Sequence, residues 1–168
     1  MAKASGRRKY YLLIVLAVLL ADRFTKLAVA RAIALHDSLT VIPGLFHLTH
    51  VQNRGAAFGL FDDSPSEWKI AMLVVFSVAA LILIAALLWK NGVAMNAMGV
   101  GLALVMGGAL GNLWDRVVSR HVTDFLDFNL GRYHWPAFNV ADSAIVVGAF
   151  LLVVDIVLLQ RPEREKKA

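Results

Sequence analysis

The sequence predicts an all-α polytopic membrane protein with four transmembrane helices, both termini cytoplasmic, and a small extracytoplasmic amphipathic β-sheet. The 168 residues are 59% hydrophobic and only 17% charged, whereas a soluble domain is nearer half apolar and a quarter charged. The apolar residues also form four stretches of about 20 residues, the length that spans a bilayer. At this length we expect one integral-membrane domain, residues 1–168.

Polar segments separate the four apolar stretches. The stretches cover about 10–32, 68–89, 93–114 and 138–159. Each of the last three is bounded by Trp or Phe on at least one side, as interfacial anchoring predicts. Lys90-Asn91-Gly92 predicts a tight turn, so the second and third helices form a hairpin.

The distribution of basic residues predicts the orientation. The net charge of +5 arises mainly at the two ends of the chain. No basic patch is interleaved with aromatic residues in a soluble segment, so we expect no nucleic-acid partner. The positive-inside rule makes both termini cytoplasmic, which leaves 33–67 and 115–137 extracytoplasmic. The chain has no cysteine, which excludes disulfides and thiolate metal sites.

The first stretch has a second interpretation as a cleavable secretory signal. Basic residues at 7–9, an apolar run and Ala28-Val29-Ala30 have that order. However, Asp22, Arg23 and Lys26 lie between the apolar run and the supposed cleavage site. A retained first helix is therefore the favoured prediction.

The first extracytoplasmic segment predicts part of the small sheet. Val41-Ile42-Pro43-Gly44 is a turn signal, and residues 46–51 alternate with period two, which is typical of a strand. Asn53-Arg54-Gly55 offers a second turn. We expect the sheet to lie on the outer membrane surface.

Costly polar residues converge on the outer third of the bilayer. Ionisable groups inside a span cost several kcal/mol and indicate function. With about 1.5 Å of rise per residue, the groups on the first, third and fourth helices reach similar depths. These groups are Asp22, Lys26, Asn112, Asp115, Asn139 and Asp142.

Helical spacing sorts these residues into faces. Gly108, Asn112, Asp115 and Arg116 recur at intervals of three and four and share one face of the third helix. Gly107 and Gly111, with Ala103, form a seam of small residues along which another helix can approach closely. We therefore expect a polar cluster walled by close-packed helices.

Two acids can meet near the outer surface. Asp124 lies in the short link between the third and fourth helices, from which it can return to Asp142. Adjacent carboxylates share one proton, so the ionised acid takes a proton from water while the protonated acid donates to a carbonyl oxygen. This arrangement of an aspartic protease needs neither metal nor covalent intermediate. Alternatively, Asp142 caps the start of the fourth helix.

Other interpretations stay open on the residues alone. Asp115 with Arg116 is expected to form an orienting ion pair, and Asp22 with Lys26 a structural salt bridge. A Ser–Lys protease would use Lys26 as base, but no serine has a recognisable context. The histidines are scattered, which argues against a metal site. A proton-coupled transporter and a purely structural membrane subunit are the rivals from other classes.

Five sequence blocks resemble the lipoprotein signal peptidases, also called signal peptidase II. In chain order the blocks are DRFTK (22–26), NRGAAF (53–58), GGALGNLWDR (107–116), VTDF (122–125) and FNVADS (138–143). They follow the family's order over essentially the whole chain, so the match is specific.

The resemblance implies an aspartic endopeptidase of the bacterial inner membrane, active near the periplasmic face. Its partners would be membrane lipid and prolipoproteins with a diacylglyceryl-modified cysteine, cut just before that cysteine. It implies a monomer without metal or cofactor. The catalytic pair falls on Asp124 and Asp142. The residues that bind substrate or support the pair would be Asn53, Gly108, Asn112, Asp115, Arg116 and Asn139, with Asp22 and Lys26 structural.

Overall fold

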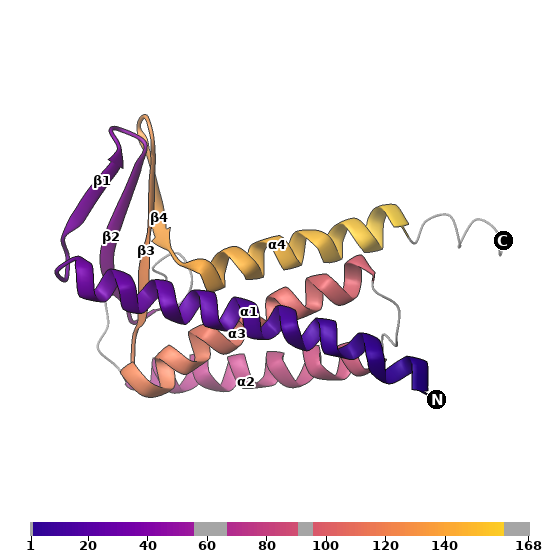
Figure 1. The fold of residues 1–168 in the computed structure, drawn as a ribbon. Coiled ribbons are helices and arrows are strands. Elements are labelled where there is room, and N and C mark those ends of the chain that lie inside the picture. The colour runs from indigo at the N-terminus through magenta and orange to yellow at the C-terminus, as the bar shows by residue number, and fades with distance from the viewer. Residues whose placement is uncertain (1, 56–66, 91–95, 160–168) are drawn as a thin grey trace.

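The helices lie side by side, and a β-sheet stands at one end of them (Figure 1). The computed structural model describes residues 2–55, 67–90 and 96–159. The helices are α1 (Ala2–Ala32), α2 (Glu67–Lys90), α3 (Ala97–Ser119) and α4 (Val140–Val154), which continues into the π-helical turn η2 (Asp155–Leu159). The strands are β1 (Ser38–Ile42), β2 (Phe46–Asn53), β3 (Val122–Leu130) and β4 (Tyr133–Phe138). The motif residues 56–58 and the predicted turn residues 91–92 lie outside the described residues.

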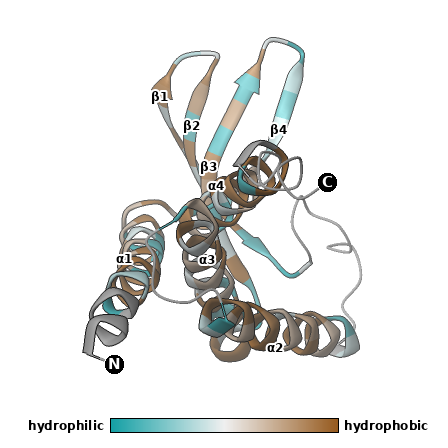
Figure 2. Ribbon diagram, turned by 90° about the vertical axis from the view of Figure 1, so that its right-hand side faces the viewer, coloured by the Kyte–Doolittle hydropathy of each residue, from teal (hydrophilic) through white to brown (hydrophobic). Residues whose placement is uncertain are grey.

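In the described ranges, three helices are long and apolar enough to cross a membrane. They are Trp68–Lys90, Ala97–Ser119 and Val140–Val157. Most residues of α2 are hydrophobic (Figure 2), and two of them, Val75 and Phe76, are 67% and 72% exposed. So much exposed apolar surface is unfavourable in water and is satisfied by lipid. The chain is therefore a multi-pass membrane protein.

The predicted bounds of the third helix are wrong at both ends. Asn96 is its N-cap, where the side chain accepts the N–H of Gly99 at 2.8 Å, and the helix ends at Arg120, whose φ is 64°. Asp115 and Arg116 lie just past the predicted span, but they are inside α3, as their predicted place on one helix face requires. The helix continues through Asp115 because this carboxylate finds cationic partners on α1. The bounds of α2 and of α4 with η2 agree with the prediction to within two residues.

The sheet is larger than predicted because both segments contribute strands. The four strands are antiparallel in the order β1-β2-β3-β4. The predicted strand at 46–51 is confirmed as β2, and its turn is made by Gly44, whose φ is 72°. Asp124, expected in a link, is a residue of β3 and is paired with Val51 of β2. Pairing with a strand from the other segment therefore fixes the position of Asp124.

Small residues let α3 approach its neighbours closely. A Cβ on Gly107 would lie 2.8 Å from Val18 Cβ, and one on Gly111 would lie 2.7 Å from Asp22 Oδ2, so the predicted seam is confirmed against α1. A Cβ on Gly108 would overlap the carbonyl oxygen of Ala141 in α4. Glycine at 108 therefore sets the position of the first turn of α4.

Replacement of Gly108 by Ala should push the start of α4 away from α3. We expect a destabilisation of about 1–3 kcal/mol, seen as a lower midpoint of thermal unfolding in detergent. Gly44→Asn is the control, because nothing lies within 4 Å of a Cβ there and Asn tolerates a positive φ. Equal midpoints for Gly108→Ala and the wild type would contradict the close approach.

Candidate active site

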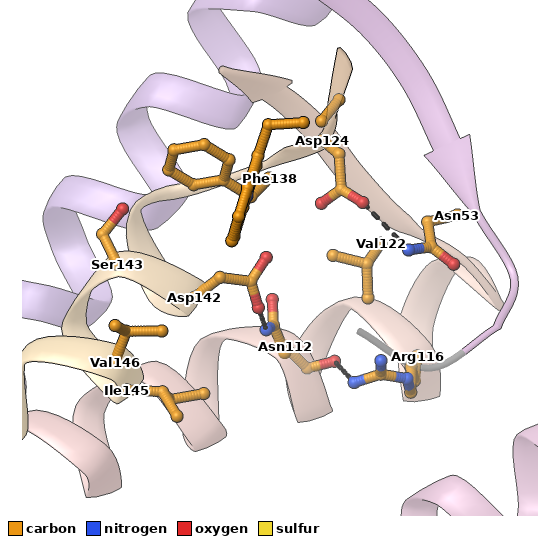
Figure 3. Close-up of a pocket in the computed structure, with 12 residues that line it drawn as sticks. Asn53, Asn112, Arg116, Val122, Asp124, Phe138, Asp142, Ser143, Ile145 and Val146 are labelled. Atoms are coloured by element: carbon orange, nitrogen blue, oxygen red, sulfur yellow. Dashed lines mark hydrogen bonds between the residues drawn. The ribbon is translucent and has the colours of Figure 1, made fainter. Parts of the chain in front are cut away.

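Asp124 and Asp142 line the same cavity. Asp124 projects from β3 and Asp142 from the first turn of α4, and Figure 3 shows both carboxyl groups directed into the space between these elements. The cavity has a volume of about 350 Å³. Asp124 is only 3% exposed. The structure thus brings together the two acids that the sequence predicted to meet.

Two side-chain amides hold Asp124. Asn53 donates from Nδ2 to Asp124 Oδ2 at 3.0 Å, and Asn139 donates from Nδ2 to Asp124 Oδ1 at 2.7 Å. The orientation of the Asn53 amide is fixed, since its Oδ1 accepts the N–H of Gly55 at 2.8 Å. Both oxygens of Asp124 therefore face donors, and its carboxyl plane is fixed by β2 and by the start of α4.

Asp142 has two roles in the local structure. Asn112 of α3 donates from Nδ2 to Asp142 Oδ1 at 2.8 Å. Asn139 is the N-cap of α4, and its Oδ1 accepts the backbone N–H of Asp142 at 2.9 Å. In return, Asp142 Oδ2 accepts the backbone N–H of Asn139 at 3.3 Å. The alternative interpretation, in which Asp142 serves the helix start, is thus also correct, at the third helical position.

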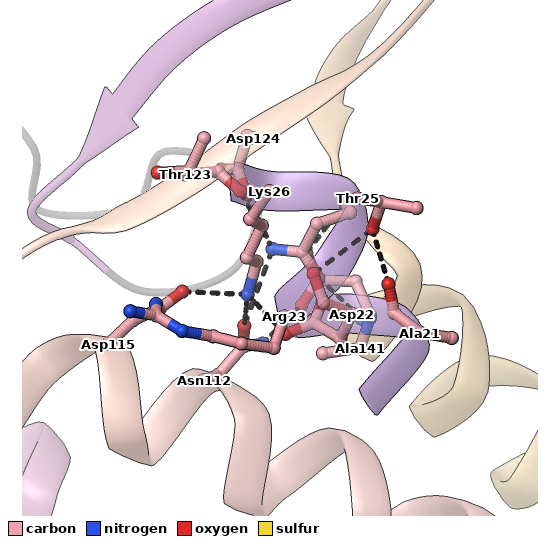
Figure 4. Close-up of polar contacts among 12 residues, drawn as sticks. Ala21, Asp22, Arg23, Thr25, Lys26, Asn112, Asp115, Thr123, Asp124 and Ala141 are labelled. Atoms are coloured by element: carbon pink, nitrogen blue, oxygen red, sulfur yellow. Dashed lines mark hydrogen bonds and ion pairs between the residues drawn. The ribbon is translucent and has the colours of Figure 1, made fainter. Parts of the chain in front are cut away.

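A buried charge cluster joins α1 to α3 beside the cavity (Figure 4). Lys26 Nζ lies 2.7 Å from Asp22 Oδ2 and 2.8 Å from Asp115 Oδ2. Arg23 Nη1 reaches Asp115 Oδ1 at 3.2 Å. The predicted salt bridge of Asp22 with Lys26 is confirmed. Its burial is nearly complete, at 1% and 3% exposure of the two side chains.

The predicted ion pair of Asp115 with Arg116 is wrong. Asp115 turns to Arg23 and Lys26 of α1, because successive helical residues do not face each other. Arg116 instead donates to the backbone oxygens of Asn112 at 3.4 Å and Gly55 at 3.2 Å. Arg116 lines the cavity, and its buried Nε has no hydrogen-bond partner among the described residues.

The other predicted residues lie close by but not all in the cavity. Asn53 and Asn112 line it, whereas Gly108 lies at the contact of α3 with α4. Most of the remaining wall is apolar and was not marked by any spacing rule. It consists of Val122, Trp135, Ala137, Phe138, Ile145 and Val146. The cavity therefore combines two acids with a surface suited to apolar groups.

Within the described ranges, no three His, Cys, Asp or Glu side chains come together as a metal site would require. His47 pairs with Asn129 at 3.1 Å, while His50 contacts the backbone oxygen of Ile33 at 2.9 Å. The cavity itself presents the carboxyl groups of Asp124 and Asp142 beside the side-chain amides of Asn53 and Asn112.

Burial, followed by the charge of Asp142, raises the pKa of Asp124 to about 7. Hydrogen bonds from Asn53 and Asn139 and the charge of Lys26 act in the opposite direction. The Asp124 carboxyl is thus protonated over a pH range in which an ordinary Asp is ionised.

Comparison with solved structures relates this fold to membrane enzymes. Two bacterial membrane enzymes determined by the in meso method superpose with TM-scores of 0.80 and 0.79, at 31% and 32% sequence identity. The first comparison covers 91% of this chain and 90% of the other, and the second covers 89% and 94%. A multi-pass membrane enzyme is therefore the class that the fold and the cavity define.

Sequence comparison identifies the family within this class. The family model for signal peptidase (SPase) II matches residues 14–158. The lipoprotein signal peptidase of Solibacter usitatus is 50% identical over 144 residues, which is 86% of each chain. That of Nitratidesulfovibrio vulgaris is 44% identical over 163 residues, covering 95% of this chain and 97% of the relative. The chain belongs to the signal peptidase II family, as its motifs predicted, and is thus a peptidase.

The raised pKa of Asp124 predicts how stability depends on pH. The folded state favours the protonated form of Asp124. The stability that protonated Asp124 contributes is therefore fully present below the unfolded-state pKa of 3.8 and is lost as the pH rises through the folded-state pKa of about 7. Over this range we expect the wild type to lose stability on the order of 1–4 kcal/mol that Asp124→Asn does not lose, because the amide does not ionise. Thermal midpoints of both proteins in detergent, measured from about pH 4 to pH 8, check this slope. Parallel curves would contradict the shift.

Proposed function

We propose that the protein is an intramembrane aspartic endopeptidase. It removes the signal peptide of diacylglyceryl-modified prolipoproteins by cutting just before the lipidated cysteine. The relatives named lipoprotein signal peptidase support this substrate class. The observation that carries the mechanism is the pair of acids, Asp124 and Asp142, in one cavity.

In the proposed reaction, a water molecule between the acids attacks the scissile carbonyl carbon. Ionised Asp142 takes a proton from the water while the water oxygen bonds to the carbonyl carbon. Protonated Asp124 donates its proton to the carbonyl oxygen. The product is a tetrahedral diol. Asp142 then gives its proton to the amide nitrogen and the C–N bond breaks. Asp124 recovers a proton from a diol hydroxyl, which restores the starting state.

The environments of the two acids support this division of roles. Asp124 is more deeply buried, and burial followed by the charge of Asp142 raises its pKa to about 7, so it is the acid that keeps a proton near neutrality. Asp142 lies in the first turn of α4, where the helix dipole favours a negative charge. Asn53, Asn112 and Asn139 orient the acids. Arg116 also lines the cavity and brings a positive charge close to both acids.

The apolar part of the cavity supports a lipid-modified substrate. Trp135, Phe138 and Ile145 line it, together with Val146, which is 61% exposed on the outer surface of α4. Because Val146 both lines the cavity and is exposed, we take this side of the cavity to open toward the hydrocarbon region. A signal peptide and its diacylglyceryl group are both apolar, so they can reach the acids without leaving the bilayer.

We extend the proposal to the placement of the whole chain. α1 is the additional span that brings the number to four, because its 31 residues are more than enough to cross a bilayer. The charged groups of Asp22, Arg23 and Lys26 within it are paired with each other or with Asp115. The start of α1 and the end of α4 lie at the end opposite the sheet (Figure 1). Both termini then face the cytoplasm, and the acids lie near the periplasmic face of the bacterial inner membrane. The single domain of residues 1–168 acts as a monomer.

Transport is the weaker alternative. A proton path would need polar groups through the depth of the helices. In the described residues, the buried acids Asp22, Asp115 and Asp124 gather toward the sheet, whereas the remaining buried acid, Asp155, lies in η2 at the other end of α4. This distribution favours a reaction at one level of the membrane.

Asp124→Asn and Asp142→Asn should each reduce cleavage of a lipidated prolipoprotein by at least about 10³-fold, because neither variant can move both protons. Purified protein in detergent with EDTA, followed by gel shift of the substrate, provides the measurement. Asp127→Asn is the matched control on β3, since Asp127 bonds His134 at 2.7 Å and does not line the cavity. Full activity of Asp124→Asn or Asp142→Asn, while Asp127→Asn is also active, would contradict the assignment of the catalytic pair.

The proposed topology predicts the result of reporter fusions. Alkaline phosphatase joined after residue 35 or 131 should be active, because both positions would be periplasmic. Fusions after residue 92 or 167 should be inactive, and green fluorescent protein at the same sites should give the reverse pattern. An active phosphatase at residue 167 would place the C-terminus on the periplasmic side and contradict the proposed topology.

A further inference from the structure

The geometry points to Lys26 as a positioning residue of the proposed reaction, because its ammonium group decides which end of the Asn112 amide faces Asp142. This inference deepens the proposed function and rests on it, since Asp142 is a reacting acid only in that function. The structural role predicted for Lys26, its ion pair with Asp22, does not involve Asn112.

The side-chain amide of Asn112 has two unlike ends, and its neighbours distinguish them. Its Oδ1 accepts from Lys26 Nζ at 3.0 Å and from Asn139 Nδ2 at 3.3 Å. Its Nδ2 donates to Asp142 Oδ1 at 2.8 Å. If the amide turned over, its NH₂ would face the ammonium group and its oxygen would face the carboxylate. Attractive contacts would then become repulsive on both sides.

Lys26 is itself held on both sides, so its ammonium group cannot follow a turning amide (Figure 4). It donates to Asp22 Oδ2 at 2.7 Å. It also lies 2.8 Å from Asp115 Oδ2, a contact with the distance of an ion pair but not the angle of a hydrogen bond. Asp22 Oδ1 accepts the N–H of Ala141 at 2.9 Å. The ammonium group is thus fixed relative to the helical turn that carries Asp142.

The charge of Lys26 also acts on the second acid. Burial and then the charge of Asp142 raise the pKa of Asp124, and the charge of Lys26 is among the influences that lower it. The groups that face Asp124 are Asp142 and Asn139 at the start of α4, Arg116 from α3, Lys26 from α1 and Asn53 from β2. Loss of the ammonium group therefore raises the pKa of Asp124. The alkaline limb of the pH–rate profile should move to higher pH.

The test removes the ammonium group in two backgrounds, each of which neutralises one of its two acidic partners. Asp22→Asn/Lys26→Met is compared with Asp22→Asn, and Asp115→Asn/Lys26→Met with Asp115→Asn. The full chain in detergent cleaves a diacylglyceryl-modified prolipoprotein. We expect each Lys26→Met step to lower kcat on the order of 10- to 100-fold and to change KM by less than about threefold. The alkaline limb of the pH–rate profile should shift to higher pH.

Arg23→Gln is the matched control within the same cluster. Arg23 pairs with Asp115 at 3.2 Å from a side chain that is 39% exposed, and it makes no contact with Asn112. We expect kcat and the alkaline limb to stay within about twofold of the wild type. A comparable loss in this variant would mean that any damage to the cluster slows the reaction, which overturns a specific role for Lys26.

A double-mutant comparison separates positioning from packing. In an Asn112→Leu background, the Lys26→Met step should change kcat by less than about twofold, because the amide through which Lys26 acts is gone. If the decreases in kcat caused by Lys26→Met and by Asn112→Leu multiply, as independent effects do, the proposal is overturned. So would a lower thermal midpoint with unchanged kcat and pH profile, or failure of both Lys26→Met pairs to fold. If the wild type does not cleave, the proposed function itself fails. If it cleaves and only the Lys26 effects are absent, this inference alone fails.

Discussion

The need to pair buried charges governs this structure. Asp22, Lys26 and Asp115 lie at 1%, 3% and 4% exposure, where an unpaired ion would carry a penalty of several kcal/mol. Their mutual contacts fix the axial position of α1 against α3, and the bond from Asp22 to the Ala141 N–H extends the constraint to α4. The glycine contacts of α3 bring the helices close enough for these short side chains to meet. The position of Asp142 depends on both conditions.

The two acids are carried by different parts of the fold. Asp142 belongs to the helices, whereas Asp124 belongs to the sheet, where β2 and β3 fix it. Asn139 joins the two parts, since its Nδ2 donates to Asp124 and its Oδ1 accepts from the Asp142 N–H. It lies where β4 ends and α4 begins and is fully buried. One asparagine at this junction thus sets the relative placement of the pair.

Local patterns in the sequence were sufficient to locate three apolar helices and to predict that most of the polar residues named above lie close together. Hydropathy located the apolar helices, and the equal depth of Asn112, Asp142 and Lys26 indicated that they meet. Long-range pairing was not accessible. Asp124 was placed in a link because its strand depends on β2, and its partner Asn53 is 71 residues away. Arg23, 92 residues from Asp115, was missed because helix alignment, and not sequence spacing, decides which charges meet.

The division of the sheet between two segments has a consequence for biogenesis. β2 leaves the ribosome before α2 and α3, and β3 follows them, so the contact of Asn53 with Asp124 must wait until the α2–α3 hairpin has entered the bilayer. A nascent chain therefore carries no assembled pair of acids while its own first segments are being inserted. Under the proposed mechanism, a chain interrupted before β3 would lack Asp124 and would therefore be inactive.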